Sequence, residues 1–151
     1  VDPVFWSSTT NGNANDLAAA NYVLSEWQER GAQHVAKLWM LGDRLIEGCR
    51  EACHSRNALL EQGSWTIEGH GARSVFGFPD EVERAFFIQG MRKQNVLANR
   101  PNFPNLSMSV GQIDQIVAAV REVAGERAGL FRAEVEKATE GRLPRRLFER
   151  R

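Results

Sequence analysis

The segment from Ser109 to Thr139, SVGQIDQIVAAVREVAGERAGLFRAEVEKAT, carries the longest helical pattern in this chain. Its apolar side chains recur at three- and four-residue steps, which places them on one helix face over about eight turns. Because such a face must be buried, we predict one long helix around which the rest of the chain packs. The apolar positions are Val110, Ile113, Val117, Val120, Ala124, Phe131 and Val135. Arg127 and Ala128 lie in the gap between Ala124 and Phe131.

Both ends of this predicted helix have local signals. Ser109 and Gln112 have the spacing of a capping box, in which each side chain bonds the backbone amide of the other residue. At the other end, Gly141 tolerates a left-handed conformation and Pro144 cannot continue a helix. We therefore predict that the helix begins at Ser109 and ends just before Gly141.

Two shorter helical patterns lie near the start of the chain. The first runs from about Asn15 to Ala32, and the second from about Gln33 to His54, with Gly31 near their junction. A link this short predicts an antiparallel helical hairpin. The apolar stripes are Leu17, Ala20, Leu24 and Trp27 in the first helix, and Val35, Leu38, Trp39, Leu45, Ile46, Cys49 and Cys53 in the second.

The middle of the chain changes character twice. Between residues 55 and 79, glycines interrupt short aromatic and β-branched pieces, which indicates small strands or a loop layer. A third helix is predicted from Asp80, its N-cap, with Glu83 at the third helical position, to about Ala98. Residues 99–108, rich in asparagine and proline, are predicted to form an irregular loop.

Together these elements predict an all-α fold within one domain spanning residues 1–151. The architecture is an up-down four-helix bundle with a small glycine- and aromatic-rich strand or loop layer at one end. Residues 1–14 are predicted to form an extended N-terminal arm, and residues 142–151 a basic tail.

Charge is balanced overall but uneven along the chain. Nineteen basic and nineteen acidic residues cancel, which argues against a protein that coats nucleic acid by bulk positive charge. The stretch between Glu83 and Asp114 nevertheless contains no acidic residue, and it holds Arg92, Lys93 and Arg100. We therefore regard this stretch as the main anion-binding candidate, with Arg142, Arg145 and Arg146 as the second.

No residue set in the sequence predicts catalysis, a cofactor or a metal. Cys49 and Cys53 lie one helical turn apart, a spacing poorly suited to a disulfide and typical of free, buried thiols. A zinc site formed with His54 and His70 is less favoured, because CxxxCH lacks the usual CxxC spacing. No apolar run approaches the roughly 20 residues of a membrane span, so we expect a soluble protein that is not exported. Because no residue set predicts catalysis, we also expect that the protein is not an enzyme.

The tryptophans are predicted to divide by element. Trp27 and Trp39 lie on helical stripes, where core packing is the common role, whereas Trp6 and Trp65 lie in non-helical segments and are candidates for subunit contacts. Trp65 and four phenylalanines are expected to form an aromatic belt outside the main bundle core, and such a belt is more often packed core than an interface. The four are Phe76, Phe78, Phe86 and Phe87.

Three short motifs follow the predicted order of elements. Ile113-Asp114 precedes Arg121, RLPRRLFE closes the chain at residues 142–149, and Trp27-Gln28 lies in the first helix. With the arm, the helices and the asparagine- and proline-rich loop, these motifs resemble the coat proteins of rod-shaped helical plant RNA viruses. Tobamovirus, tobravirus, hordeivirus and furovirus coats are the relatives concerned.

The resemblance implies a structural capsid protein that polymerises helically with itself and packages single-stranded RNA. It would be found in the virion, assembled in the host cytoplasm. The implied RNA-binding region runs from Arg92 through Lys93 and Asn95 to Arg100, with the basic side chains on phosphates. Ile113 would lie against base faces, and Asp114 would accept a hydrogen bond from a ribose hydroxyl.

The resemblance also implies a structural role for Arg121, together with Phe148 and Glu149. In the family, a buried arginine of the fourth helix pairs with an aspartate near the end of the third. Residues 88–95, IQGMRKQN, contain no aspartate, so the partner of Arg121 stays open.

Two other classes of function fit the same elements. A phage or bacterial helical scaffold or adaptor protein would have the bundle and arm without RNA affinity. A small-molecule-sensing bundle would need a concave pocket lined by the phenylalanine cluster.

Overall fold

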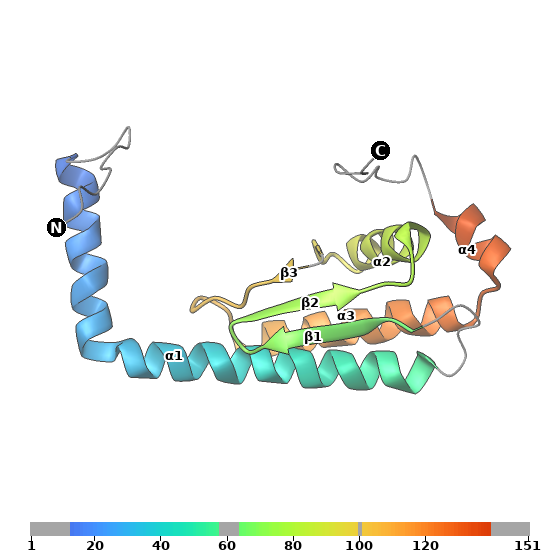
Figure 1. Cartoon of the computed structure of the whole chain (residues 1–151), viewed down its shortest axis with the longest axis horizontal. Coiled ribbons are helices and arrows are strands. Elements are labelled where there is room, and N and C mark those ends of the chain that lie inside the picture. The colour runs from blue at the N-terminus through green and yellow to red at the C-terminus, as the bar shows by residue number, and fades with distance from the viewer. Residues whose placement is uncertain (1–12, 58–63, 100, 140–151) are drawn as a thin grey trace, which may run out of the picture. The chain divides into compact units, whose positions relative to one another are not determined.

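A computed structural model of the chain describes residues 13–57, 64–99 and 101–139 (Figure 1). The described part is mainly helical, with a small antiparallel sheet. The chain divides into two units, Val1–Lys37 and Leu38–Arg151, and each is described by itself. The elements are α1 (Ala14–Asn57), β1 (Thr66–His70), β2 (Arg73–Gly77), α2 (Glu81–Lys93), β3 (Pro101–Asn102), α3 (Val110–Ala128) and α4 (Arg132–Ala138).

The predicted N-terminal hairpin is wrong, because α1 is one uninterrupted helix from Ala14 to Asn57. Gly31, expected at the end of a first helix, is helical. An isolated glycine costs a helix only about 1 kcal/mol, and no proline lies nearby to break the backbone hydrogen bonds. Trp27 also packs over Gly31, where a Cβ would lie 2.9 Å from Cε3 of the indole. Within the described residues, none of the helices is both long and apolar enough to cross a membrane.

The strand layer is confirmed. Strands β1 and β2 form an antiparallel hairpin in which Ile67 lies opposite Phe76. Strand β3 comes from the predicted loop 99–108 and pairs Asn102 with Ser74, so that loop is not irregular throughout. Ile67 and Phe76 are both buried, which places the core under this face of the sheet.

The start of α2 is confirmed, and its end lies earlier than predicted. Asp80 is the N-cap, and its Oδ1 accepts hydrogen bonds from the amides of Val82 and Glu83. The helix ends at Lys93 instead of Ala98. Asn95 adopts a left-handed conformation (φ 60°), while the amides of Asn95 and Val96 donate to the carbonyls of Arg92 and Met91. This is a Schellman motif.

The predicted long helix is two helices. Its capping box is confirmed, because the amides of Ser109 and Gln112 donate to each other's side chains. The helix nevertheless ends at Ala128, and the amide of Leu130 donates back to the carbonyl of Arg127. Helix α4 then begins at Arg132, and its buried Val135 packs in the core. The predicted stop signals Gly141 and Pro144 lie outside the described residues.

The tryptophan assignments are reversed. Trp27 and Trp39 are 43% and 44% exposed, whereas Trp65 is only 2% exposed. Trp65 lies edge-on to Phe78 and Phe87, at ring-centroid distances of 5.7 and 5.4 Å. The aromatic belt is therefore part of the core of the second unit, and Trp65 is not available for the predicted subunit contact. Trp6 and most of the arm lie outside the described residues.

Cys49 and Cys53 are free and buried, as predicted. Burial raises the pKa of the Cys49 thiol to about 12, with a smaller contribution from Cys53, and raises that of Cys53 to about 11. Both thiols therefore stay protonated at neutral pH. Among the described residues, no three His, Cys, Asp or Glu side chains are grouped so that they could hold a metal ion.

These thiols predict a loss of stability at alkaline pH. The unfolded chain releases thiol protons near pH 8.5, whereas the folded chain keeps them until about pH 11 to 12. Their contribution is complete below about pH 8.5 and decreases above it, by up to about 1.4 kcal/mol per pH unit for each thiol. Urea unfolding at pH 8 and pH 10 should show this decrease, and Cys49→Ala should reduce it. An identical pH dependence in Cys49→Ala would contradict the prediction.

Candidate nucleic-acid interface

The predicted RNA-binding arginine and lysine lie at the C-terminal end of α2. Arg92 and Lys93 occupy the last helical turn, and both are exposed. The Schellman turn at Asn95 fixes the direction in which the chain leaves this helix. Two neighbouring cations on a defined helix end can pair with phosphates that follow one another along a strand. Arg100 lies outside the described residues.

Asn95 has a backbone role that the sequence prediction missed. Its left-handed conformation closes α2, and asparagine tolerates this conformation better than most residues. Its side chain is exposed beside a surface hollow of about 540 Å³ between the end of α2 and the outer face of α3. Glu122 also lines this hollow, and its charge opposes a phosphate there.

Ile113 does not take the role that the resemblance implies. Its side chain is fully buried in the core, so it cannot lie against a base. Its position on the apolar stripe of α3 already predicted this burial. The prediction of an exposed contact came from the motif alone.

Asp114 is held by an arginine that no sequence motif indicated. Arg44, on α1, donates from Nε to Oδ1 at 2.6 Å and from Nη2 to Oδ2 at 3.0 Å. The hydrogen bond from Arg44 lowers the pKa of the Asp114 carboxyl, and the positive charge of Arg44 adds to this effect. Both oxygens of Asp114 already accept from Arg44, so binding a ribose hydroxyl would compete with this bidentate pair.

Arg121 is not the buried arginine. Its side chain is 53% exposed, and its contact with Glu51 is a surface pair at 3.8 Å. The implied partners Phe148 and Glu149 lie outside the described residues. The prediction that Arg121 is buried is therefore wrong, and its ion pair with Glu51 lies at the surface.

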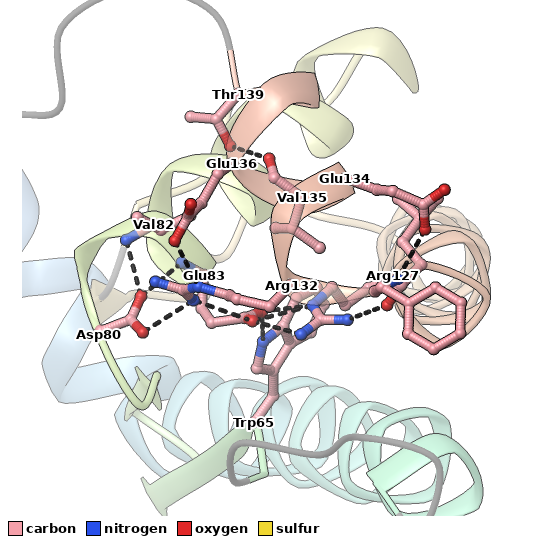
Figure 2. A network of polar contacts seen from close by, with 12 residues as sticks. Trp65, Asp80, Val82, Glu83, Arg127, Arg132, Glu134, Val135, Glu136 and Thr139 are labelled. Carbon is pink, nitrogen blue, oxygen red and sulfur yellow. Dashed lines mark hydrogen bonds and ion pairs between the residues drawn. The ribbon is translucent and has the colours of Figure 1, made fainter.

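Among the described residues, the buried arginine is Arg127, further along α3. Its side chain is 4% exposed and that of Glu83 is 2% exposed. Nε and Nη2 of Arg127 both donate to the Glu83 carboxylate, with the shortest distance 2.6 Å, and Nη1 donates to the carbonyl of Leu130 at 2.8 Å. The indole Nε1 of Trp65 donates to Glu83 Oε2 at 3.0 Å (Figure 2).

A second arginine connects this pair to the surface. Arg132, the first residue of α4, lies between Asp80 and Glu83 and also pairs with Glu136 (Figure 2). Burial raises the pKa of the Asp80 carboxyl, but hydrogen bonds from the Glu83 amide and Arg132 outweigh it, so the net shift is downward. The network joins the start of α2 to α3 and α4, and its role is to fix these helices.

One signal in the sequence indicates that Arg127 faces inward. Arg127 lies where the apolar stripe of Ser109–Thr139 would require an inward-facing residue, between Ala124 and Phe131. A charged residue at such a position needs a buried partner. Glu83 gave no matching signal, because its position three residues after the N-cap Asp80 is a common one for a carboxylate at a helix start.

Comparisons of this chain with protein-family models, with curated proteins and with solved structures found no match.

Proposed function

We propose that this chain is a structural coat protein that polymerises helically and packages single-stranded RNA, the function that its sequence resemblance implies. One observation carries the proposal. Large apolar side chains lie uncovered along α1 before Lys37, where a helix of an isolated subunit would be polar. Exposed apolar surface of this kind marks a protein contact. These residues, between 42% and 68% exposed, are Leu17, Tyr22, Val23, Leu24, Trp27 and Val35.

Charge is compatible with assembly. A neutral subunit can stack on its copies without the repulsion that a strongly basic one would meet. RNA phosphates would then be bound by a few cations, of which Arg92 and Lys93 are exposed. The four-helix bundle of the coat family is also part of this proposal. The single helix α1 stands where the sequence predicted the first two helices of that bundle. In the assembly, a neighbouring subunit would supply the missing helix contact.

The scaffold or adaptor protein without RNA affinity is the second candidate. The burial of Ile113 and the engagement of Asp114 by Arg44 favour it, because both reduce the number of groups left for RNA. The favourable effect of cations at a helix C-terminus, about 0.3–1 kcal/mol each, also accounts for Arg92 and Lys93 without RNA. A small-molecule sensor has less support. Phe76, Phe78 and Phe87 pack on one another instead of lining a pocket.

RNA binding distinguishes the two candidates. Replacement of Arg92, Lys93 and Arg100 by alanine should weaken binding of unrelated single-stranded RNAs equally. It should also reduce the salt slope by about 0.7 for each lost contact, hence by about 2. The free energy of unfolding should change by less than about 0.5 kcal/mol for each exposed position. Fluorescence anisotropy at several salt concentrations measures the affinity.

Arg121→Ala is the matched control, because it removes an exposed arginine from α3 and should leave the salt slope nearly unchanged. Electron microscopy and the ratio of absorbance at two ultraviolet wavelengths complete the test. Rods that contain RNA support the coat function, and rods without nucleic acid support the scaffold. An unchanged salt slope in the triple variant would exclude this RNA site.

A further inference from the structure

The apolar residues exposed on α1 are spaced like the seam of a coiled coil. Leu17, Ala20, Leu24 and Trp27 are separated by three, four and three residues, and the same alternation continues through Gly31, His34 and Leu38. Such a 3-4 repeat places the a and d positions of the heptad on one narrow stripe, which in a coiled coil faces another helix. Leu17, Leu24 and Trp27 are 60%, 62% and 43% exposed, so within the described residues this stripe has no covering helix.

The two halves of the stripe differ in chemistry. The N-terminal half is aliphatic, with Leu17, Ala20 and Leu24. The C-terminal half is aromatic: the ring of Trp27 covers Gly31 and lies edge-on to His34, at a centroid distance of 5.8 Å and an interplanar angle of 77°. A partner helix of the same sequence covers both halves best when it runs in the opposite direction.

We propose that this segment of α1 pairs antiparallel with the same segment of a second copy of the chain. The inference deepens the proposed function, since it rests on the self-association proposed there and names the surface. In the register considered, Leu24 packs against Trp27 of the second copy, Ala20 against Gly31, and Leu17 against His34. The two-fold axis repeats each contact, so six layers form.

The flanking residues of this register are complementary. In an antiparallel pair, g positions meet g positions and e positions meet e positions. Asp16 then meets Lys37 of the second copy, twice by symmetry, and all four side chains are at exposed positions. Asn21 meets Gln28, the remaining e-position contact is between Ala14 and Val35, and the remaining g-position contact places Val23 beside the apolar stem of Arg30.

Other arrangements are less favourable. An antiparallel pair displaced by one heptad to lengthen the overlap would bring Arg30 against Arg30 of the second copy. A parallel pair would place Trp27 on Trp27 and His34 on His34, and would separate Asp16 from Lys37. The paired segments in the proposed register are about 30 Å long, because each helical residue adds about 1.5 Å.

Cysteine cross-linking in the full-length protein tests the direction of the pair. A mixture of Asn21→Cys and Gln28→Cys chains should form mainly the mixed disulfide on mild oxidation, because these two positions meet only in the antiparallel register. Each variant alone should cross-link little. The native Cys49 and Cys53 are buried with raised pKa values and give a low background. Efficient cross-linking of Ala20→Cys to itself would indicate a parallel pair and overturn the proposal.

Sedimentation without RNA tests whether the apolar stripe of α1 forms the dimer. Leu24→Glu should convert the dimer to monomer with unchanged helical circular dichroism. Tyr22→Glu is the matched control, because Tyr22 is 68% exposed but lies outside the stripe, and it should remain dimeric. Asp16→Lys should weaken the dimer several-fold, and adding Lys37→Asp should restore it.

The outcomes separate this inference from the coat function. A wild-type dimer that never forms rods with RNA would support the helix pair and contradict the coat function. Rods formed equally well by Leu24→Glu would overturn the helix pair and leave the coat function standing. A wild-type chain that is monomeric without RNA would also overturn the helix pair.

Discussion

Arg127→Ala is expected to lower the free energy of unfolding by about 3–5 kcal/mol, because the ion pair that remains for the buried Glu83 carboxylate is the longer contact to Arg132, at 3.5 Å. Glu83 is only 2% exposed, so water cannot replace the lost hydrogen bonds without opening the core. The loss is a large part of the 5–15 kcal/mol that stabilises an ordinary domain. Urea unfolding followed by circular dichroism measures it.

Arg121→Ala is the control for this change, since it removes an arginine from the same helix at a position that is 53% exposed. It should cost less than about 0.5 kcal/mol. The double variant Glu83→Gln with Arg127→Met removes both charges and should recover part of the stability. Equal losses for the Arg121 and Arg127 variants would show that burial of the pair is not the cause.

The sequence predicted the features that depend on neighbouring residues. The caps at Ser109 and Asp80 were identified because the residues that make each cap lie within three positions of one another. Small strands were one of the two alternatives predicted for residues 55–79, because the glycines and β-branched residues there change the period locally, and β1 and β2 confirm that alternative. A local signal also explains why a helical hairpin was wrongly predicted where α1 lies. A glycine weakens a helix by a small amount, and the surrounding residues decide whether the helix ends.

The features that the sequence did not predict depend on distant contacts. Glu83 and Arg127 are 44 residues apart, and Arg44 and Asp114 are 70 residues apart. Periodicity can show that Arg127 faces inward, but it cannot select its partner among nineteen acidic residues. In the candidate RNA site, Arg92 and Lys93 are exposed in the last turn of α2, which ends earlier than predicted. The roles given to Ile113 and Asp114 came from a motif and not from the apolar stripe.

Trp27, Trp39 and Trp65 show why a stripe alone does not establish burial. Spacing identifies which side chains share a helix face, but a face is buried only where another element covers it. Trp65 belongs to a segment with no helical period, yet it is buried, because Phe78 and the α2 residues Phe86 and Phe87 lie against its ring. In α1 before Lys37, the stripe that contains Trp27 is regular, and no other described element covers it. A regular stripe without a cover is the pattern expected of a subunit whose partner is another chain.

Gly42→Ala is expected to destabilise the fold by about 3 kcal/mol or more, at the upper end of the range for overpacked cores. A Cβ at Gly42 would overlap the carbonyl group of Gly71, in the turn between β1 and β2, and a Cβ at Gly71 would lie 2.7 Å from the carbonyl oxygen of Trp39. Both contacts are with backbone atoms, which cannot rotate away as a side chain can. The hairpin would have to move off α1, and the stacking of His70 on Trp39, at a centroid distance of 5.3 Å, would be lost with it.

Gly111→Ala provides the comparison, because Gly111 is also helical but the nearest atom to its added Cβ is the Ser109 hydroxyl oxygen, at 3.9 Å. That change should be neutral or stabilise α3 by up to about 1 kcal/mol, since alanine is the better helix former. The two variants add the same methyl group to a helical glycine, so the difference between their urea midpoints isolates the close approach of α1 to the hairpin. If Gly42→Ala is as mild as Gly111→Ala, the hairpin does not lie against α1 as described.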